Sequence, residues 1–159
     1  MDVFSHLLWT AIAFHGERPF WLWALLGTLP DILTWGPWTV PLIARRRWND
    51  FDLDRVPGWV MGLYGATHNL FTPLALWGAA FAATGQVVTA PLAWLLHVLM
   101  DAPTHSRHFL PTPILWPVSD WKFPGVRWGQ RWFMAGNIAA MAALMLYLFA
   151  VQGVRLKWA

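Results

Sequence analysis

The sequence contains no cysteine, and charged side chains make up only 12% of its 159 residues. Without cysteine the chain has neither disulfides nor thiolate ligands, so a bound metal would be held by nitrogen and oxygen donors. The formal net charge is +3, but the Lys and Arg residues lie between apolar segments and form no long basic stripe. This pattern argues against nucleic-acid binding.

Hydrophobic residues are abundant instead. They make up 57% of the chain, and the mean hydropathy of +0.42 is above that of most soluble domains of this size. The 14 Trp residues are scattered through the sequence, as expected for aromatic side chains that anchor at bilayer interfaces. We therefore expect an all-α integral membrane protein, with residues 1–159 forming a single helical domain surrounded by lipid.

Apolar segments predict a polytopic bundle of about four to five helices. The clearest is 132–151, which carries no formal charge and is followed by Arg155 and Lys157. About 20 residues at 1.5 Å each cross a ~30 Å hydrocarbon core. The other expected insertions are 3–14, 19–35, 57–83 and 86–102, of which the first is short for a full span.

Two polar connections predict the orientation of this bundle. They are 36–56 and 103–131, and the second is too rich in proline for a helix, so we expect an ordered loop that caps one membrane face. With five insertions both connections fall on one side together with most of the Lys and Arg residues. The positive-inside rule makes this the cytoplasmic side of the plasma (inner) membrane.

Five ionisable residues interrupt the apolar segments: His6, Asp31, His68, His97 and Asp101. Within a bilayer each costs at least ~2.5–3.5 kcal/mol on insertion scales and therefore needs a reason. In the expected topology all five lie in the half of the membrane nearer the basic loops. His97 and Asp101 are four residues apart, which places them on one helical face where they can bind one ion.

Imidazole and carboxylate donors suit Zn²⁺, with Mn²⁺ and Fe²⁺ as alternatives. We predict that the five residues bind one or two divalent ions. Thr67 and Asn69 flank His68 and are candidates for orienting the ligands. His105 and His108 follow Pro103, where we expect the helix to end or kink, and they are further candidate ligands or substrate-facing groups.

Several short motifs occur in a fixed order: "SHLL" at 5–8, "LPD" at 29–31, "THN" at 67–69, "LLHVLMD" at 95–101, "PTH" at 103–105 and "TPILWP" at 112–117. This order resembles the LexA-regulated, membrane-bound metal-dependent hydrolase family. The resemblance covers about residues 5–123 and leaves the expected C-terminal helix outside it. That family is in turn distantly similar to the zinc-dependent phospholipase C superfamily, which is all-helical with a multinuclear zinc site.

The resemblance implies that Asp31, His68, His97 and Asp101 are the ligands of one zinc ion. It also implies that His6 and a bridging Asp101 form part of a neighbouring site. The chain lacks the downstream His and His-x-x-x-Glu pair that the third zinc of those enzymes needs. The resemblance therefore implies one or two ions.

The sequence departs from the family pattern at three positions. Leu33 and Thr34 stand where family members often have an Asp and a His, and Tyr64 stands where many have an Arg. The chain thus lacks one carboxylate that would support a second metal. It also lacks a cation that would bind phosphate.

These features lead to a functional hypothesis with two alternatives. The hypothesis is a hydrolase in which a metal-activated water attacks a phosphoester of a lipid or lipid-linked substrate. Asp31 is then the general base or a ligand. The alternatives are a non-enzymatic membrane protein with a structural metal site or an ion- or proton-conducting role, and a scaffold in which the polar residues only pair with one another.

Overall fold

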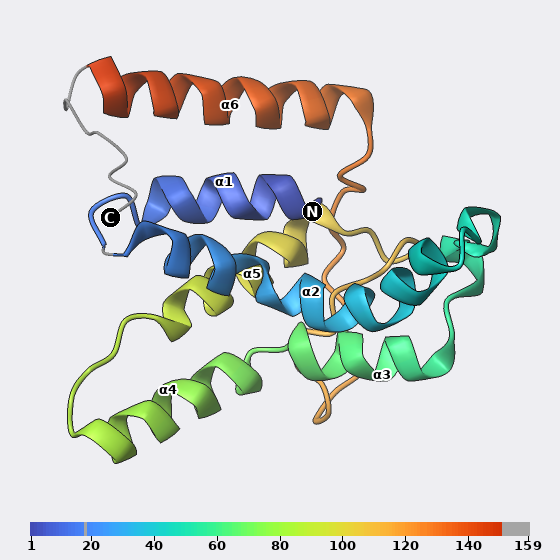
Figure 1. The fold of residues 1–159 in the computed structure, drawn as a ribbon, viewed down its shortest axis with the longest axis horizontal. Helices are drawn as coiled ribbons and strands as arrows, with labels where there is room; N and C mark the ends of the chain where they lie inside the picture. Colours follow the sequence, from blue (N-terminus) through green and yellow to red (C-terminus); the bar gives the residue numbers. More distant parts are fainter. Residues whose placement is uncertain (18, 151–159) are drawn as a thin grey trace.

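The computed structural model describes residues 1–17 and 19–150, and in this part of the chain it contains six α-helices and no strand (Figure 1). The predicted all-α class is confirmed. Of the expected C-terminal span, residue 151 lies outside the described residues, as do Arg155 and Lys157. The helices are α1 (Val3–Ala13), α2 (Phe20–Ala44), α3 (Gly58–Thr67), α4 (Phe71–Thr84), α5 (Pro91–Thr104) and α6 (Arg131–Ala150), with two short 3-10 helices, η1 (Trp48–Asp50) and η2 (Leu53–Arg55), between α2 and α3.

Helix α2 is longer than the sequence predicted. Residues 36–44, expected in a loop, are helical, although α2 contains Pro30, Pro37 and Pro41. A proline removes one backbone donor and disfavours a helix interior, but aromatic packing holds the second half of α2. The ring of Trp35 lies 6.0 Å from that of Tyr64, and the ring of Trp38 lies 5.0 Å from that of Phe51. Tertiary packing here outweighs the tendency of the prolines to end the helix.

The apolar segment 57–83, predicted as one span, forms two helices instead. Asn69 lies at the break: its amide nitrogen donates to the carbonyls of Gly65 and Ala66, at 2.8 and 2.9 Å, near the end of α3. Its amide oxygen accepts from the backbone N–H of Thr72, at 2.9 Å, in the first turn of α4. One side chain therefore caps both helices, and the break leaves His68 as the C-cap of α3.

Helix α2 occupies the centre of the bundle and packs against α1, α3 and α5. It crosses α1 where Gly27 faces Thr10. A Cβ atom on Gly27 would lie only 2.0 Å from Oγ1 of Thr10, so only glycine permits this approach. The close crossing fixes α1 against the helix that carries Asp31.

Polar side chains gather inside the bundle and apolar ones outside it. The described residues bury more polar or charged than hydrophobic side chains, while α4 and α6 expose Phe81, Ile138 and Leu146 at 50%, 55% and 68%. Apolar surface of this extent is unusual for a soluble monomer. Among the described helices α6 is the one long and apolar enough to cross a membrane, and α1 and α4 are shorter apolar helices.

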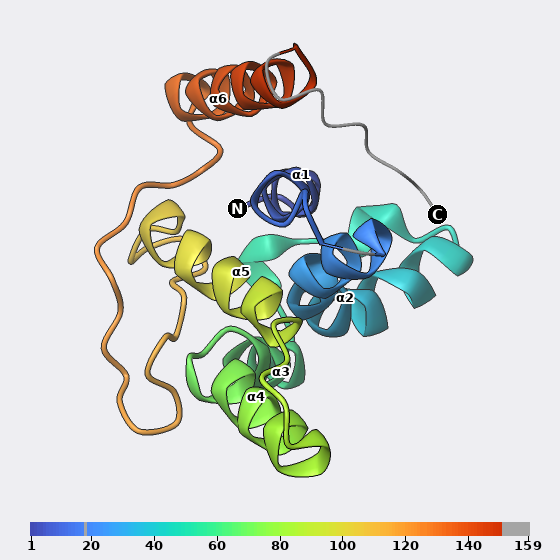
Figure 2. The same cartoon turned by 90° about the vertical axis from the view of Figure 1, so that its left-hand side faces the viewer.

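Helix α6 lies outside α1 at the edge of the bundle (Figure 2). Its contact with α1 includes Asn137, whose side-chain nitrogen donates to Oγ of Ser5 at 2.8 Å. The amide oxygen of Asn137 accepts from the indole N–H of Trp9, also at 2.8 Å. A polar contact between apolar helices is a common way to hold helices together in lipid.

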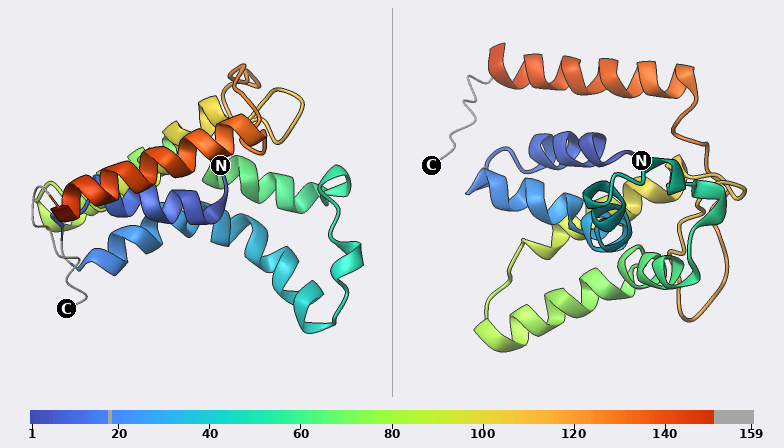
Figure 3. Two further views of the ribbon diagram at one scale, coloured as in Figure 1. Left: turned by 90° about the horizontal axis from the view of Figure 1, so that it is seen from above. Right: turned by 45° about the vertical axis from the view of Figure 1, so that its right-hand side comes forward.

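The proline-rich segment after α5 contains no regular helix and returns beside the C-terminal end of α5 (Figure 3). The backbone N–H groups of Val126 and Trp128 donate to the carbonyls of Pro103 and Thr104, at 2.8 and 2.9 Å. These bonds satisfy carbonyls that the helix end leaves free. This segment and the η1–η2 segment lie toward the same end of the bundle, and the turn after α4 lies toward the other (Figure 1).

The α1–α2 crossing makes a specific prediction about glycine. We expect Gly27→Ala to lower the stability of the protein by about 1–3 kcal/mol, the usual cost of an overpacked core. Gly36→Ala in the same helix is the matched control, because its Cβ would meet only Ile32, at 4.0 Å. Alanine there should be neutral or stabilising by up to ~1 kcal/mol. Thermal unfolding in detergent measures both, and equal melting temperatures for the two variants would contradict the crossing.

Candidate metal centre

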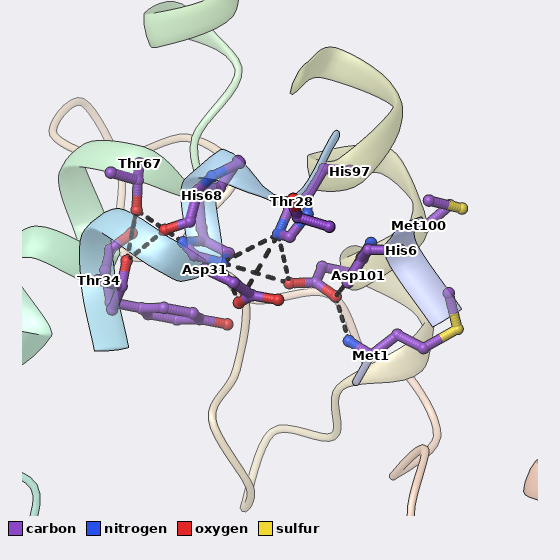
Figure 4. Close-up of polar contacts among 12 residues, drawn as sticks. Met1, His6, Thr28, Asp31, Thr34, Thr67, His68, His97, Met100 and Asp101 are labelled. Carbon is purple, nitrogen blue, oxygen red and sulfur yellow. Dashed lines mark hydrogen bonds and ion pairs between the residues drawn. The ribbon is translucent and has the colours of Figure 1, made fainter. Parts of the chain in front are cut away.

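The five ionisable residues that interrupt the apolar segments lie together in the centre of the bundle (Figure 4). His6 comes from α1, Asp31 from α2, His68 from the end of α3, and His97 and Asp101 from α5. Each is at most 5% exposed. The break between α3 and α4 and the close α1–α2 crossing both contribute to this arrangement, because they direct His68 and His6 toward α5.

Four donor atoms face one another in the centre of the bundle. They are Oδ1 of Asp31, Nε2 of His68, Nε2 of His97 and Oδ2 of Asp101. The nitrogen of His68 lies 3.1 Å from that of His97, 3.4 Å from Asp31 and 3.5 Å from Asp101, and the nitrogen of His97 lies 3.5 Å from Asp101 and 4.0 Å from Asp31. Donors about 2.0–2.2 Å from a tetrahedral Zn²⁺ are about 3.3–3.6 Å apart. The donor atoms of His68, His97 and Asp101 have about these spacings and could therefore hold an ion, whereas Asp31 lies farther from His97, at 4.0 Å.

The backbone of α2 sets the tautomer of His97. Its Nδ1 lies 2.7 Å from the carbonyl oxygen of Gly27. A carbonyl only accepts, so Nδ1 carries the hydrogen, and in the neutral ring Nε2 presents a lone pair to the other three donors. A second partner of this kind is the usual means of orienting a metal-binding histidine.

Thr67 contacts the ring of His68 in a similar way. Its Oγ1 lies 2.8 Å from Nδ1 of His68 and 2.9 Å from the carbonyl of Leu63. When the hydroxyl donates to that carbonyl, it accepts from Nδ1–H of His68, which leaves Nε2 as a lone pair. Two lone pairs 3.1 Å apart repel each other, and a cation between them removes the repulsion.

Thr34 is a residue whose part in this arrangement the sequence did not reveal. Its Oγ1 lies 2.7 Å from Oγ1 of Thr67 and donates to the carbonyl of Pro30 at 2.9 Å. It is fully buried. Its position three residues after Asp31 was the available signal, because that spacing places both on one side of a helix.

The two carboxylates carry charge that the described residues balance only in part, through the α-amino group of Met1 at Asp101. Oδ2 of Asp31 and Oδ2 of Asp101 are buried and have no hydrogen-bond partner in the described part of the chain. A buried carboxylate without partners costs several kcal/mol. A divalent cation beside both carboxylates would neutralise the remaining charge.

Asp101 lies between two groups of residues. While Oδ2 faces His68 and His97, Oδ1 accepts from the α-amino group of Met1 and lies 2.8 Å from Nε2 of His6. The ring of His6 stacks on that of His97, with centroids 3.7 Å apart. His6 thus contacts the outer oxygen of Asp101, as expected for a residue of a neighbouring site. A second ion there would have to replace the amine as the partner of Oδ1.

The two further candidate histidines have different positions. His105 is 5% exposed, and its Nδ1 lies 3.5 Å from Oδ1 of Asp101. Helix α5 ends at Thr104, one residue past Pro103, close to the end that the sequence predicted, and His105 as its C-cap still contacts Asp101. His108 is exposed and lies outside the cluster.

No protein-family model, no curated protein and no solved structure matches this chain. The centre is therefore judged by its own donors and distances. Its buried His and Asp groups could hold a metal ion, and the same groups also form ion pairs with one another. Asn69, expected to orient a ligand, bonds to backbone groups and Thr72 and so positions His68 only through the chain.

Metal content tests the centre directly. We expect purified protein to carry about one Zn²⁺ at the four-donor position, and His97→Ala to lose it because a tetrahedral site needs all its ligands. His108→Ala removes an exposed imidazole and serves as the matched control. Elemental analysis of detergent-purified protein gives the stoichiometry. The absorption of Co²⁺-loaded protein reports tetrahedral geometry.

Asp101→Asn provides a second variant, because it keeps the shape of the side chain while removing its charge. Circular dichroism of each variant shows whether the helices have formed. Equal metal in the wild type, His97→Ala and Asp101→Asn, with the helices intact, would rule out the four-donor site.

Proposed function

We propose that the chain is a membrane-embedded, metal-dependent hydrolase that acts on a phosphoester of a lipid or lipid-linked substrate. The ion, Zn²⁺ in the first place, is held by His68, His97 and Asp101, with Asp31 beside them as the general base or a further ligand, so that a water molecule can reach the ion. The single observation that carries the proposal is the group of His68, His97 and Asp101, whose buried donor atoms lie 3.1–3.5 Å apart, with the Asp31 carboxylate 3.4 Å from His68. The ordered motifs that resemble the membrane-bound hydrolase family and, more distantly, phospholipase C enzymes support it.

The arrangement of polar and apolar side chains supports a location in the membrane. A buried polar centre surrounded by exposed apolar helices suits lipid as the solvent. The two basic loops lie toward one end of the bundle, as a polytopic topology requires (Figure 1). In the proposal these loops face the cytoplasm at the plasma (inner) membrane, and the metal centre lies in the half of the bilayer nearer to them.

Each residue of the metal centre has a separate role in the proposed reaction. A bound ion would lower the pKa of a water molecule and neutralise charge on a phosphoryl oxygen. Oδ2 of Asp31 has no hydrogen-bond partner among the described residues and is free to accept a proton from that water. His68 and His97 keep their donor nitrogens directed inward through Thr67 and Gly27. Asp101 fixes the position of the ion.

A cavity of about 450 Å³ gives a substrate access to this centre. Asp31 and Asp101 both line it, together with His105. Access favours a catalytic site over the alternative of a purely structural ion, because a structural site is usually closed by its ligands. Ion or proton conduction remains the second candidate, since intramembrane Asp and His residues also mark conduction paths.

The role of Asp31 makes the hydrolase testable. We expect Asp31→Asn to retain the ion, because the amide oxygen can still bind it, while hydrolysis falls about 10²–10⁴-fold through loss of the general base. The substrates are bis(p-nitrophenyl) phosphate and a phospholipid. Asp120→Asn, in an exposed loop, is the matched control. A metal-loaded wild type that hydrolyses neither substrate would contradict the proposal, as would full activity in Asp31→Asn.

The absence of cysteine makes the topology testable by single-cysteine labelling. We expect Asn49→Cys and Ser119→Cys to react with a membrane-impermeant maleimide in inverted vesicles but not in intact cells, because both loops face the cytoplasm. Gln86→Cys, in the turn after α4, should show the reverse pattern. Labelling of positions 49 and 119 from opposite sides would overturn the topology.

A further inference from the structure

The cavity at the metal centre extends well beyond the carboxylates. Past Asp31 it is lined by Trp35, Thr39 and Phe51. A second cavity, of about 310 Å³, shares Thr39 and Phe51 with the first and is also lined by Leu42 and Ile43. Because the two cavities share these walls, they lie next to each other, and together they reach from the metal centre to the C-terminal part of α2.

This space is long and is bounded along its length by one helix. Asp31, Trp35, Thr39 and Ile43 recur every four residues and therefore follow one side of α2. At 1.5 Å per residue, Ile43 lies about 18 Å from Asp31 along the helix axis. Phe51 and Leu53 close the space from the η1–η2 segment, and Leu110 and Trp128 from the proline-rich segment. A polar end and an extended apolar remainder match an amphiphile with one chain.

The charges of the residues that line the two cavities restrict which headgroup can bind there. Among the described residues that line the two cavities there is no Lys or Arg side chain, and the amino group of Met1 is paired with Asp101. Tyr64, which also lines the first cavity, donates its hydroxyl to the carbonyl of Leu110 at 2.9 Å. Negative charge on a ligand would be met by the ion almost alone. A monoanionic diester fits this environment better than a dianionic monoester.

We propose that this space binds the alkyl chain of a single-chain phosphodiester, with the phosphate at the metal centre and the chain along α2 toward Ile43. The proposal rests on the proposed function for the position of the phosphate. It adds the substrate class: an amphiphile with one apolar chain and a monoanionic headgroup. Thr39 lines both cavities and would therefore lie beside the middle part of the alkyl chain.

Photocrosslinking tests where the chain lies. The probe is a methyl phosphodiester of a dodecyl chain with a terminal diazirine, added to metal-loaded protein in phosphatidylcholine nanodiscs. We expect crosslinks in residues 39–53 that unlabelled dodecyl methyl phosphate removes. Thr39→Trp should reduce them about tenfold, within the range expected when a bulky side chain is forced into a filled site. Val40→Trp, at an adjacent position that is 61% exposed, is the matched control and should leave them unchanged.

A second variant keeps the test informative if Thr39→Trp does not fold. Ile43 is 45% exposed and lines the far end of the space, so Ile43→Trp disturbs the bundle less. We expect it to reduce labelling by the dodecyl probe and to leave labelling by the corresponding hexyl probe unchanged. Equal effects on both probes would contradict a chain that extends from the metal centre to Ile43.

Other outcomes overturn the proposal or separate it from the hydrolase. Crosslinks spread over α4 and α6 without competition would place the chain in the bulk bilayer and overturn it. Stronger competition by dodecyl phosphate than by its methyl diester would overturn the assigned headgroup. Hydrolysis of bis(p-nitrophenyl) phosphate, which has no alkyl chain, decides the hydrolase separately. Labelling of 39–53 without any hydrolysis supports the chain site and contradicts the enzyme.

Discussion

Two carboxylates inside an apolar bundle impose the constraint on which the rest of the structure depends. Asp31 and Asp101 each have a buried oxygen without a partner in the described chain. Such a pair is stable only where positive charge lies close to both. The α-amino group of Met1 supplies it at one oxygen of Asp101. The helices that surround the pair form a frame for groups that could hold a metal ion and that also pair with one another.

The frame is built mostly from interactions that involve the backbone. A carbonyl of α2 orients His97, and a hydroxyl at the end of α3 orients His68. Asn69 divides one apolar segment into two helices and so gives His68 a position at a helix end rather than within a helix. The polar interior leaves apolar side chains for the outside, which is the arrangement that lipid requires. The same frame leaves a long space beside α2 through which an apolar chain can approach the centre.

The sequence predicted features that depend on residues close together in the chain. It did not predict features that depend on contacts between distant residues. The all-α class and the closeness of His97 and Asp101 followed from composition and helical spacing, which are local. The extension of α2 through Pro37 and Pro41 did not, because contacts of Trp35 and Trp38 with residues far along the chain maintain it. The capping role of Asn69 was not predicted, because in the sequence Asn69 is simply one polar residue within an apolar segment. His105 was a candidate from the sequence, but its contact with Asp101 could not be predicted because it depends on how α5 ends after Pro103.

Gly27 links the chemistry of the centre to the order in which the bundle assembles. Its missing side chain admits Thr10 of α1, while its carbonyl holds the ring of His97 on α5. His97 therefore acquires its donor tautomer only after α2 and α5 have met, and α2 is seated fully only once α1 has crossed it. Capture of an ion would then be a late event in biogenesis, and an ion-loaded molecule would be one whose helices had inserted and docked correctly.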